Sequence, residues 1–539
     1  MFEPSYSPPS APRRLERLLK WGIVAGLVAL AASSGWFFVA KSPVFPVVAL
    51  LALALGAWLV SSPFAMLVGF LAVLFVRPAE LFPALEALKL GKLSMLGAVG
   101  YFVLSRLFLR RVQPAPTSFN VLMVWLAVAV WVSGQVGIGR ALSDAVFTDV
   151  FVKILLLFFL IVHLLDSPRR ALQFQLVLSG LTGFIAAYTL WAKSTGTALI
   201  EGTRAAGVGM HGDPNDTALV LLMGAPFLIA ATLETRGLRR FGLGLLLVLV
   251  LAGIVSTQSR GGFLGLGAGV FVLMRHRFKS RAARVSLVAV LVLGMAAVGL
   301  KGRATTAGGG VDESAQGRLV AWKAGMRMFR ARPLTGMGLS TFGMAFPAYA
   351  EALPFEKKSM TAHNSYVLCL AEVGLFGTTP FVLLVVGTLV VSLRVSRGAA
   401  TAPPSLERAL RLGFAGNAAA VLTASFFLSQ TWMWFLYILF AQAAALGVLY
   451  GVPFRPGAAL LRLFAPRVGR LPAPLPEAGP RWPVGIAASL PVYSRTASRE
   501  QKITDFTEPP PRSVHWSTAP RGAGLGQGQV RPHLKVPSG

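Results

Sequence analysis

The sequence predicts an all-α polytopic membrane protein, and three observations predict this fold class. Of the 539 residues, 55% are hydrophobic and only 13% are charged, against about 25% charged residues in ordinary soluble proteins. The mean hydropathy is positive. Apolar runs of about 16 to 23 residues recur along the chain, and a helix of this length crosses about 30 Å of hydrocarbon. A soluble globular protein is therefore excluded.

We expect about fourteen transmembrane helices. Twelve or thirteen helices is the alternative. The third, sixth and tenth ranges are short, and Ser61 and Ser62, between the second and third ranges, predict only a hairpin. The predicted ranges are 21–40, 44–60, 62–76, 93–109, 119–137, 151–165, 171–192, 216–233, 240–257, 261–274, 284–300, 364–393, 409–429 and 431–452.

Basic residues predict which side of the membrane each connection faces. With the N-terminus inside, arginines concentrate in the even connections, as the positive-inside rule requires. Examples are Arg110 and Arg111, Arg236 to Arg240, Arg275 to Arg284, and Arg394 to Arg411. We read the first apolar run as an uncleaved span, and an even number of spans returns the C-terminus to the inside.

The chain divides by composition into five parts. They are a cytoplasmic N-terminus at 1–20, transmembrane helices over 21–300, a large outer (periplasmic) loop at 301–363, C-terminal transmembrane helices over 364–452, and a basic, Pro-rich, mostly disordered cytoplasmic tail at 453–539. The formal net charge of +30 indicates contact with membrane lipids, so we expect no nucleic-acid partner. Cys369 is the single cysteine, which excludes disulfides and cysteine-based metal sites.

The first outer segment, residues 201–220, contains Arg204, His211, Asp213, Asn215 and Asp216. Asn215 or Asp216 can cap the helix that follows, so capping is one interpretation of these polar side chains. Arg204 fits either a lipid headgroup or a bound anion. His211 with Asp213 and Asp216 also permits a hard-metal site, but three loop residues give a weak pattern, and we predict no metal and no cofactor.

The second outer segment is STQSRGGFLG, residues 256–265, in which Arg260 lies between two predicted spans with almost no loop. An arginine at such a depth either extends to the interface or needs an anion or carbonyl groups to offset its desolvation. Gly261 and Gly262 allow a close backbone approach, which would suit a phosphate.

The third outer segment, 301–363, is too long for a simple connector. Leu319, Trp322, Met326 and Phe329 follow helical spacing within it. This pattern, interleaved with basic residues, predicts an amphipathic helix on the membrane surface. Surface anchoring explains most of its charge, leaving Arg318 and Arg332 as candidates for ligand contact.

The loop ends at TAHNSYVLCLAEVGLFG, residues 361–377. His363 precedes a long apolar helix that Asn364 or Ser365 can cap, and a histidine at this position can act as a base or a hydrogen-bond donor. Glu372 lies deeper in the same predicted helix. A carboxylate within a membrane needs a partner, and an arginine is the candidate we expect.

These segments resemble the O-antigen ligase and O-antigen polymerase superfamily of bacterial inner membranes. The resemblance rests on TRAAGVGMHGDPNDTA, the SRGG turn, RLVAWKAGMRMFRARPLTGMGLSTF and HNSYVLCLAEVGLFG. It covers about residues 20–452 and implies a GT-C-like membrane glycosyltransferase that works without metal. The donor it implies is a glycan on undecaprenyl diphosphate, and the acceptor is a lipid A core or another polysaccharide.

The resemblance also implies roles for individual residues. Arg204 and Arg260 match arginines thought to bind the donor diphosphate, and His363 matches a histidine thought to assist attack by the acceptor. Weaker candidates for binding the diphosphate or glycan are Arg318, His211, Asp213, Asn215, Asn364 and Arg332.

We therefore predict an O-antigen ligase-like enzyme in the bacterial inner membrane, active at the periplasmic face. A repeat-unit polymerase of the same superfamily is the alternative, since ligase and polymerase differ only in the acceptor. A lipid-linked oligosaccharide flippase or transporter is the alternative of a different class. A transporter would show charges or broken helices near the membrane midplane, whereas the arginines and His363 fall at the outer ends of the predicted spans.

Overall fold

The fold is described from a computed structural model, which describes residues 61–107, 117–197, 199–200, 202–208, 212–275, 313–350 and 360–457 and a few isolated positions. All of these residues belong to the first of two compact units, Met1–Pro466. The second unit, Arg467–Gly539, lies outside the described residues. So do most of the predicted spans 44–60 and 284–300 and the whole of 21–40.

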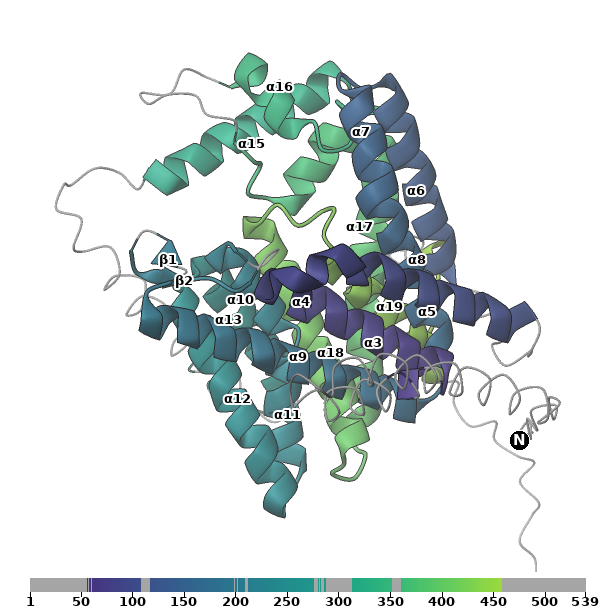
Figure 1. Ribbon diagram of the computed structural model, residues 1–539, viewed down its shortest axis with the longest axis vertical. Coiled ribbons are helices and arrows are strands. Elements are labelled where there is room, and N and C mark those ends of the chain that lie inside the picture. The colour runs from purple at the N-terminus through teal and green to yellow at the C-terminus, as the bar shows by residue number, and fades with distance from the viewer. Residues whose placement is uncertain are drawn as a thin grey trace, which may run out of the picture. The chain divides into compact units, whose positions relative to one another are not determined.

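The described chain is almost entirely helical, with one two-stranded antiparallel sheet (Figure 1). Its elements are α3 (Pro63–Val76), α4 (Pro78–Leu81), η1 (Pro83–Leu88), α5 (Leu90–Leu107), α6 (Ser118–Val136), α7 (Arg140–Val146), η2 (Phe147–Phe151), α8 (Val152–Leu164), α9 (Pro168–Thr195), β1 (Leu199–Ile200), β2 (Arg204–Ala205), α10 (Pro214–Leu222), α11 (Ala225–Glu234), α12 (Gly237–Thr257), α13 (Arg260–Met274), α15 (Glu313–Ala331), α16 (Phe342–Tyr349), α17 (Ser365–Ala399), α18 (Leu406–Ala424), η4 (Ser425–Phe427) and α19 (Trp434–Leu449).

The protein is an all-α polytopic membrane protein. Within the described part, nine helical stretches are long and apolar enough to cross a membrane, and α13 and α19 are two shorter apolar helices. Every predicted span that falls on described residues overlaps one of these helices. The three remaining predicted spans are those that lie outside the described residues.

The helix ends form two groups. At one end, β2 contacts the last residue of α12, and the first turns of α10 and α13 lie beside it. At the other end, Arg408 of α18 pairs with Glu234 of α11 at 2.5 Å. There too, Arg275 donates to Ser396 Oγ of α17 at 2.6 Å. The second group contains the arginines that the charge pattern predicts on the inner side.

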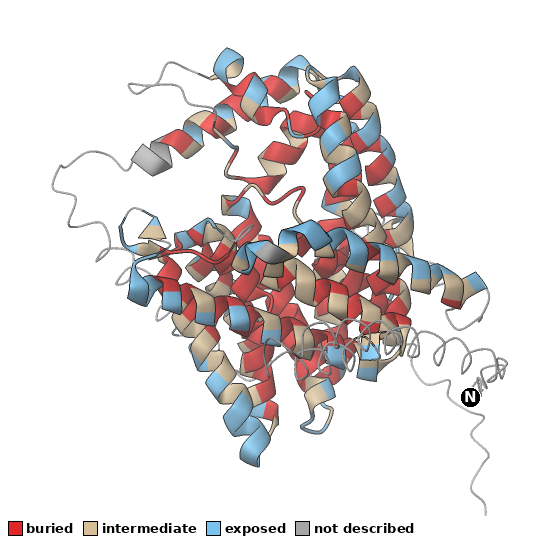
Figure 2. Cartoon of the chain, viewed as in Figure 1, coloured by how far each residue is buried: buried red, intermediate tan, exposed pale blue. Residues whose placement is uncertain are grey.

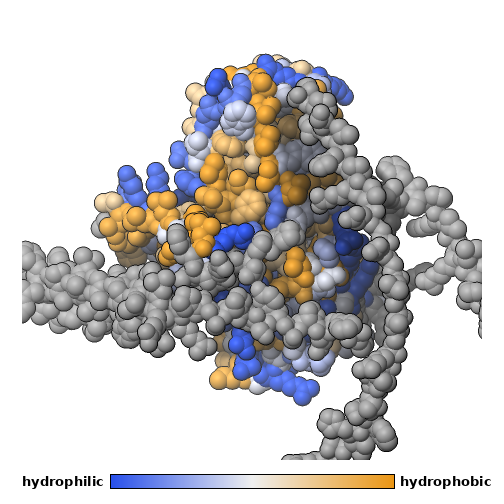
Figure 3. All heavy atoms as spheres, turned by 90° about the vertical axis from the view of Figure 1, so that its right-hand side faces the viewer, coloured by the Kyte–Doolittle hydropathy of each residue, from blue (hydrophilic) through white to orange (hydrophobic). Residues whose placement is uncertain are grey.

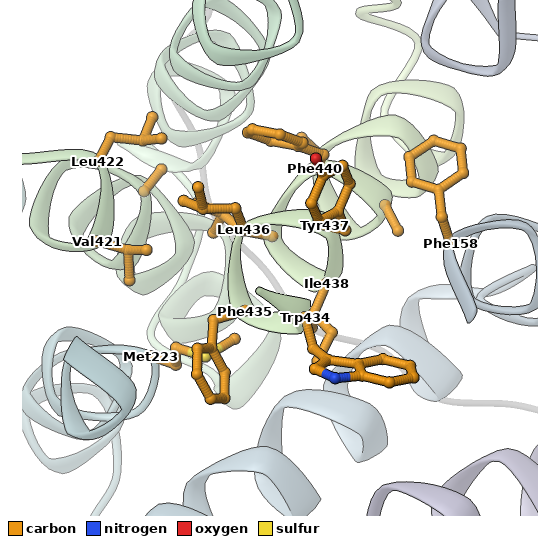
Figure 4. Close-up of a cluster of buried hydrophobic side chains, with 14 of the residues drawn as sticks. Phe158, Met223, Val421, Leu422, Trp434, Phe435, Leu436, Tyr437, Ile438 and Phe440 are labelled. Carbon is orange, nitrogen blue, oxygen red and sulfur yellow. The ribbon is translucent and has the colours of Figure 1, made fainter. Parts of the chain in front are cut away.

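The helix α19 lies at the centre of the bundle. Residues from Trp434 to Gly447 are all buried, as the red ribbon there shows (Figure 2). A helix that is apolar on every side is typical of a buried position. Figure 4 shows Phe435, Leu436 and Tyr437 packed among side chains of neighbouring helices, including Met223 and Phe158. This core fixes the helices that carry the candidate site.

Several helices at the periphery of the bundle expose apolar side chains. On α6, Val121, Val124, Val128 and Trp131 follow helical spacing and are each about half exposed or more. Hydrophobic side chains also appear at the surface in the view turned by 90° (Figure 3). An exposed apolar stripe is unfavourable in water and favourable against lipid tails.

The span Pro214–Glu234 is broken between α10 and α11. A break in the hydrocarbon region leaves backbone groups that need partners. Here the Met223 carbonyl accepts from Gln175 Nε2 at 3.1 Å and Asn417 Nδ2 at 2.7 Å. The Asn417 Oδ1 in turn accepts from Phe227 N at 3.0 Å. Buried amides therefore satisfy the break.

The glycines of α13 allow close helix packing. A Cβ at Gly262 would lie 2.6 Å from Ala218 Cβ of α10, and one at Gly265 would lie 2.6 Å from the Ala420 carbonyl of α18. Both glycines are buried. Gly262 of the SRGG turn therefore brings α13 against α10, and Gly265 brings it against α18. Gly262 has a packing role, and its N–H donates to Ser259 Oγ instead of facing a phosphate.

The helix α17 is broken at Gly374, whose φ is 56° and ψ is −161°. The outer segment 333–338 lies along this break. Main-chain bonds join Met337 N to the Ala371 carbonyl, Gly338 N to the Glu372 carbonyl, Leu375 N to the Pro333 carbonyl and Phe376 N to the Leu334 carbonyl, at 2.8–3.0 Å. A Cβ at Gly336 or Gly374 would fall 2.4 Å from the opposing backbone, so both positions require glycine.

Candidate functional site

Asn215 joins two of the predicted outer segments. Its Oδ1 accepts from Arg204 Nη2 at 2.9 Å and from Ser259 Oγ at 2.8 Å. The Arg204 Nε donates to the Thr257 carbonyl at 3.3 Å. The structure therefore brings Arg204 to the turn that carries Arg260, although 53 residues separate Arg204 from Thr257.

The loop that carries Arg204 is also tied to the start of α10. Asp213 caps this helix by accepting from Asn215 N at 2.7 Å and Asp216 N at 3.4 Å. Thr217 donates to the Asp213 carbonyl and accepts from Gly207 N at 2.8 Å. The cap is therefore Asp213 and not Asn215 or Asp216 as we expected, because the helix begins at Pro214 and both of those residues lie in its first turn. Asp213 is exposed.

Arg260 is the first residue of α13, after the cap Ser259. The Ser259 Oγ accepts from Gly262 N at 3.2 Å. Arg260 is exposed, in contrast to its buried neighbours Ser259 and Gly261. Because the N-terminal end of a helix carries a partial positive charge, the starts of α10 and α13 add to the field of the two arginines.

His363 immediately precedes the cap of α17 and is half-buried. Its φ is 46°, a left-handed conformation that a residue with a side chain adopts at some cost. Its backbone N–H donates to Ser429 Oγ at 2.9 Å. Contacts with surrounding residues must hold His363 in this conformation. The contact with Ser429 comes from the segment before α19.

Burial lowers the pKa of His363 below its ordinary value of 6.5, and the positive charge of Arg318 lowers it further. The carboxylate of Asp213 acts in the opposite direction. The net direction is downward, so the imidazole is neutral at pH 7. A neutral imidazole accepts a proton, as a general base must. These electrostatic effects also relate His363 to the outer helix α15 and to the start of α10.

The other predicted site residues have separate positions. Asn364 is 1% exposed and caps α17 by accepting from Tyr366 N and Val367 N at 2.9 and 3.1 Å. Arg332 donates to the Val136 carbonyl at the end of α6, at 2.6 Å. His211 lies outside the described residues. Structural contacts thus occupy Asn364 Oδ1 and Arg332 Nη1.

Glu372 has partners other than the arginine we expected. Its Oε1 accepts from Phe342 N at 2.9 Å and its Oε2 accepts from Trp432 Nε1 at 2.5 Å. The side chain is 2% exposed. Because backbone and indole N–H groups satisfy this carboxyl group, it joins the outer segment before α16 to the segment before α19.

Sequence reasoning missed the turn 428–431. Ser429 accepts from His363, and Gln430 Nε2 donates to Asp216 Oδ1 at 2.5 Å. The signal was present, because the triplet SQT interrupts an apolar stretch. It also lies between the thirteenth and fourteenth predicted spans, a connection that the charge rule assigns to the same outer side as Arg204 and Arg260.

The outer helix α15 buries Ala321, Ala324 and Met328 and leaves Leu319 56% exposed. Trp322 packs edge-to-face on Phe426 of η4, with centroids 5.6 Å apart. The protein-facing side is therefore formed by Ala321, Ala324, Met328 and Trp322, and Leu319 belongs to the uncovered side. This packing holds Arg318, near the start of α15, where its charge acts on His363.

The arrangement places Arg204 and Arg260 at the N-terminal ends of α10 and α13. The charge of Asp213, the cap of α10, also acts on the neutral His363. Arginines bind phosphate groups with charge-assisted hydrogen bonds, and a neutral histidine can remove a proton from a hydroxyl group. The chemistry that this set of groups can support is displacement of a phosphate-type leaving group by a hydroxyl nucleophile.

Residues 245–382 match the model of a protein family described as O-antigen ligase. The match includes Arg260, Arg318, Arg332, His363 and Asn364, and Arg204, Asp213 and Asn215 precede it. No curated protein matches the chain.

Proposed function

Because residues 245–382 support the assignment of the chain to the O-antigen ligase and polymerase superfamily, we propose that it is an O-antigen ligase-like glycosyltransferase. It moves a glycan from undecaprenyl diphosphate to a lipid A core or another surface acceptor. The reaction takes place at the periplasmic face of the bacterial inner membrane, and both termini are cytoplasmic. The observation that carries the proposal is the convergence of Arg204 and the Arg260 turn on Asn215.

In this proposal Arg204 and Arg260 bind the diphosphate of the donor. The bond between the anomeric carbon and the phosphate oxygen breaks, and the oxygen leaves with the electron pair. Fixed positive groups in a site poor in water stabilise the growing negative charge better than bulk water does. Asn215 contributes by holding the Arg204 side chain through its Oδ1.

His363 acts on the acceptor. As the acceptor oxygen forms its bond to the anomeric carbon, its proton passes to the neutral imidazole. The lowered pKa of His363 supports this role, because the base is unprotonated before the reaction. A single displacement inverts the configuration at the anomeric carbon.

The broken span α10–α11 bears on the transporter alternative. Transporters use broken helices near the midplane to bind charged cargo. Here Gln175 and Asn417 occupy the backbone groups of the break, and both side chains are buried. The break is therefore a packed part of the core, which favours an enzyme whose site lies at the helix ends.

The first test is the length of the glycan on undecaprenyl diphosphate in a deletion strain of the native host, measured by lipid extraction and mass spectrometry. Long polymer on the carrier supports the ligase. Single repeat units on the periplasmic side indicate the polymerase, and single units on the cytoplasmic side indicate a flippase and overturn the proposal.

Complementation then tests the site. Arg204→Ala, Arg260→Ala and His363→Ala should each fail to restore transfer while the protein remains in the membrane. Arg140→Ala is the matched control, because Arg140 is 69% exposed and pairs with Asp144 of its own helix. Full activity of Arg260→Ala would contradict the assignment.

A further inference from the structure

The turn 428–431 is bound tightly to the first residue of α17. Ser365 Oγ donates to the Leu428 carbonyl at 2.6 Å and accepts from Gln430 N at 2.9 Å. Thr431 Oγ1 donates to the Ser365 carbonyl at 2.6 Å. Ser365 and Thr431 are fully buried. The turn and the start of α17 therefore move as one unit.

The same turn binds the histidine directly. The Ser429 Oγ accepts the N–H of His363 at 2.9 Å, and His363 has the left-handed φ of 46°. Loss of this acceptor would leave the N–H of a strained, half-buried residue without its partner. The backbone would then be free to relax toward an ordinary conformation.

On its other side, the turn binds the helix that carries Asn215. Gln430 Nε2 donates to Asp216 Oδ1 at 2.5 Å, across 214 residues of sequence. Gln430 is 2% exposed, and its Oε1 has no hydrogen-bond partner in the part of the chain that the structure describes. A buried amide with an unsatisfied oxygen is costly, so a leucine of similar size would serve packing better.

We propose that Ser429 and Gln430 are positioning residues that fix His363 relative to the first turn of α10. This inference rests on the proposed glycosyl transfer, because the role it gives these residues is to fix the distance between the base and the diphosphate site. The link runs from His363 through Ser429 and Gln430 to Asp216. Asp216 lies beside Asn215, which binds Arg204. Neither Ser429 nor Gln430 touches a substrate in this role.

The pH dependence of the reaction in the Ser429 variants reports the position of His363, because the Ser429 hydroxyl binds the His363 backbone, whereas Gln430 also contacts the titratable Asp216. The charged groups that act on its imidazole are Arg318 of α15 and Asp213 at the start of α10, and Asp216 lies on the far side of Gln430. Displacement of His363 toward solvent reduces its burial, which is the largest cause of its lowered pKa. A positioning defect therefore raises this pKa toward 6.5, whereas a general loss of folded protein leaves it unchanged.

The experiment uses the full-length protein, purified into nanodiscs, with the carrier-linked glycan extracted from the deletion strain as donor and lipid A core from the same host as acceptor. Ser429→Ala, Ser429→Thr and Gln430→Leu are compared with the native chain by kcat, donor KM and the pH profile of kcat. The matched control is Gln442→Leu, since Gln442 is equally buried and donates to Gln175 within the core.

We expect Ser429→Ala and Gln430→Leu to lower kcat by about 10- to 100-fold with little change in donor KM, as small misplacements of a reacting group do. The acidic limb of the pH profile should move to higher pH. Ser429→Thr, which keeps the hydroxyl group, should restore both. Gln442→Leu should change melting temperature without moving the pH profile.

Three results separate the possible failures. If His363→Ala transfers as fast as the native chain, the proposed function itself is wrong. If transfer requires His363 but Ser429→Ala and Gln430→Leu keep the native kcat and pH profile, only the positioning inference is overturned. A loss of kcat with the native pH profile and a melting temperature lowered as in Gln442→Leu also overturns it, because that pattern is purely structural.

Discussion

Arg204 and Asn215 are joined by a 2.9 Å hydrogen bond between the guanidinium Nη2 and the amide Oδ1. The same oxygen accepts from Ser259, so one side chain aligns the Arg204 loop with the Arg260 turn. Asn215 therefore holds Arg204 directly and the residue before Arg260, although it carries no charge.

Asn215→Ala should raise the donor KM about tenfold, because removal of Oδ1 frees the Arg204 side chain and leaves a hydrogen bond to a charged group unmade. Asn215→Asp keeps an acceptor oxygen and should retain more activity. Transfer assays at varied concentrations of the carrier-linked donor measure this. An unchanged KM in Asn215→Ala would show that the alignment of Arg204 does not matter for donor binding.

Arg318→Gln should shift the acidic limb of the transfer rate to higher pH. The Arg318 charge disfavours protonation of His363, so its removal raises the pKa and the inactive imidazolium forms earlier on acidification. Asp213→Asn should shift the limb the opposite way, since a favourable carboxylate is lost while asparagine still caps α10. Arg318→Lys keeps the charge and is the control. If neither Arg318→Gln nor Asp213→Asn moves the pH profile, these two charges do not influence the pKa of His363.

Glu372→Leu should destabilise the protein by about 2–5 kcal/mol, because the N–H groups of Phe342 and Trp432 would each lose a buried acceptor. Glu372→Gln keeps one acceptor oxygen and should cost less. Thermal unfolding in detergent, followed by tryptophan fluorescence, measures both. Equal melting temperatures for the native chain and Glu372→Leu would mean that this carboxyl group does not hold the outer segment.

Gly262→Val should reduce the amount of folded protein in the membrane, because a Cβ there falls 2.6 Å from Ala218 Cβ. Overpacking of this kind costs about 1–3 kcal/mol or more. Gly242→Val is the matched control, since Gly242 has no neighbouring atom within 4 Å of an added Cβ. Size-exclusion profiles of the two variants in one detergent give the comparison, and similar profiles would argue against tight packing of α13 on α10.

Much of the fold follows from the sequence because length and hydropathy determine a membrane helix almost by themselves. The predicted range 216–233 falls on the stretch Pro214–Glu234, but its break at Met223 depends on Gln175 and Asn417, which lie far away in the sequence. Such a break depends on tertiary partners, so local hydropathy does not reveal it.

The candidate site divides in the same way. The charge rule placed Arg204 and Arg260 on one side of the membrane, and the structure joins their segments through Asn215. The partners of Glu372 could not be anticipated, because one is a backbone N–H group that becomes available only where segment 338–342 folds. The role of Ser429 was hidden because its contact with His363 uses a backbone atom.

The break of α17 at Gly374 has a consequence for natural variation. Four main-chain bonds attach segment 333–338 to this break, and its close backbone approach requires glycine at positions 336 and 374. Because these four bonds use main-chain atoms, they place no demand on the side chain of Leu334, which is 67% exposed. Residue 334 can therefore vary in type while the segment 333–338 keeps its attachment to α17.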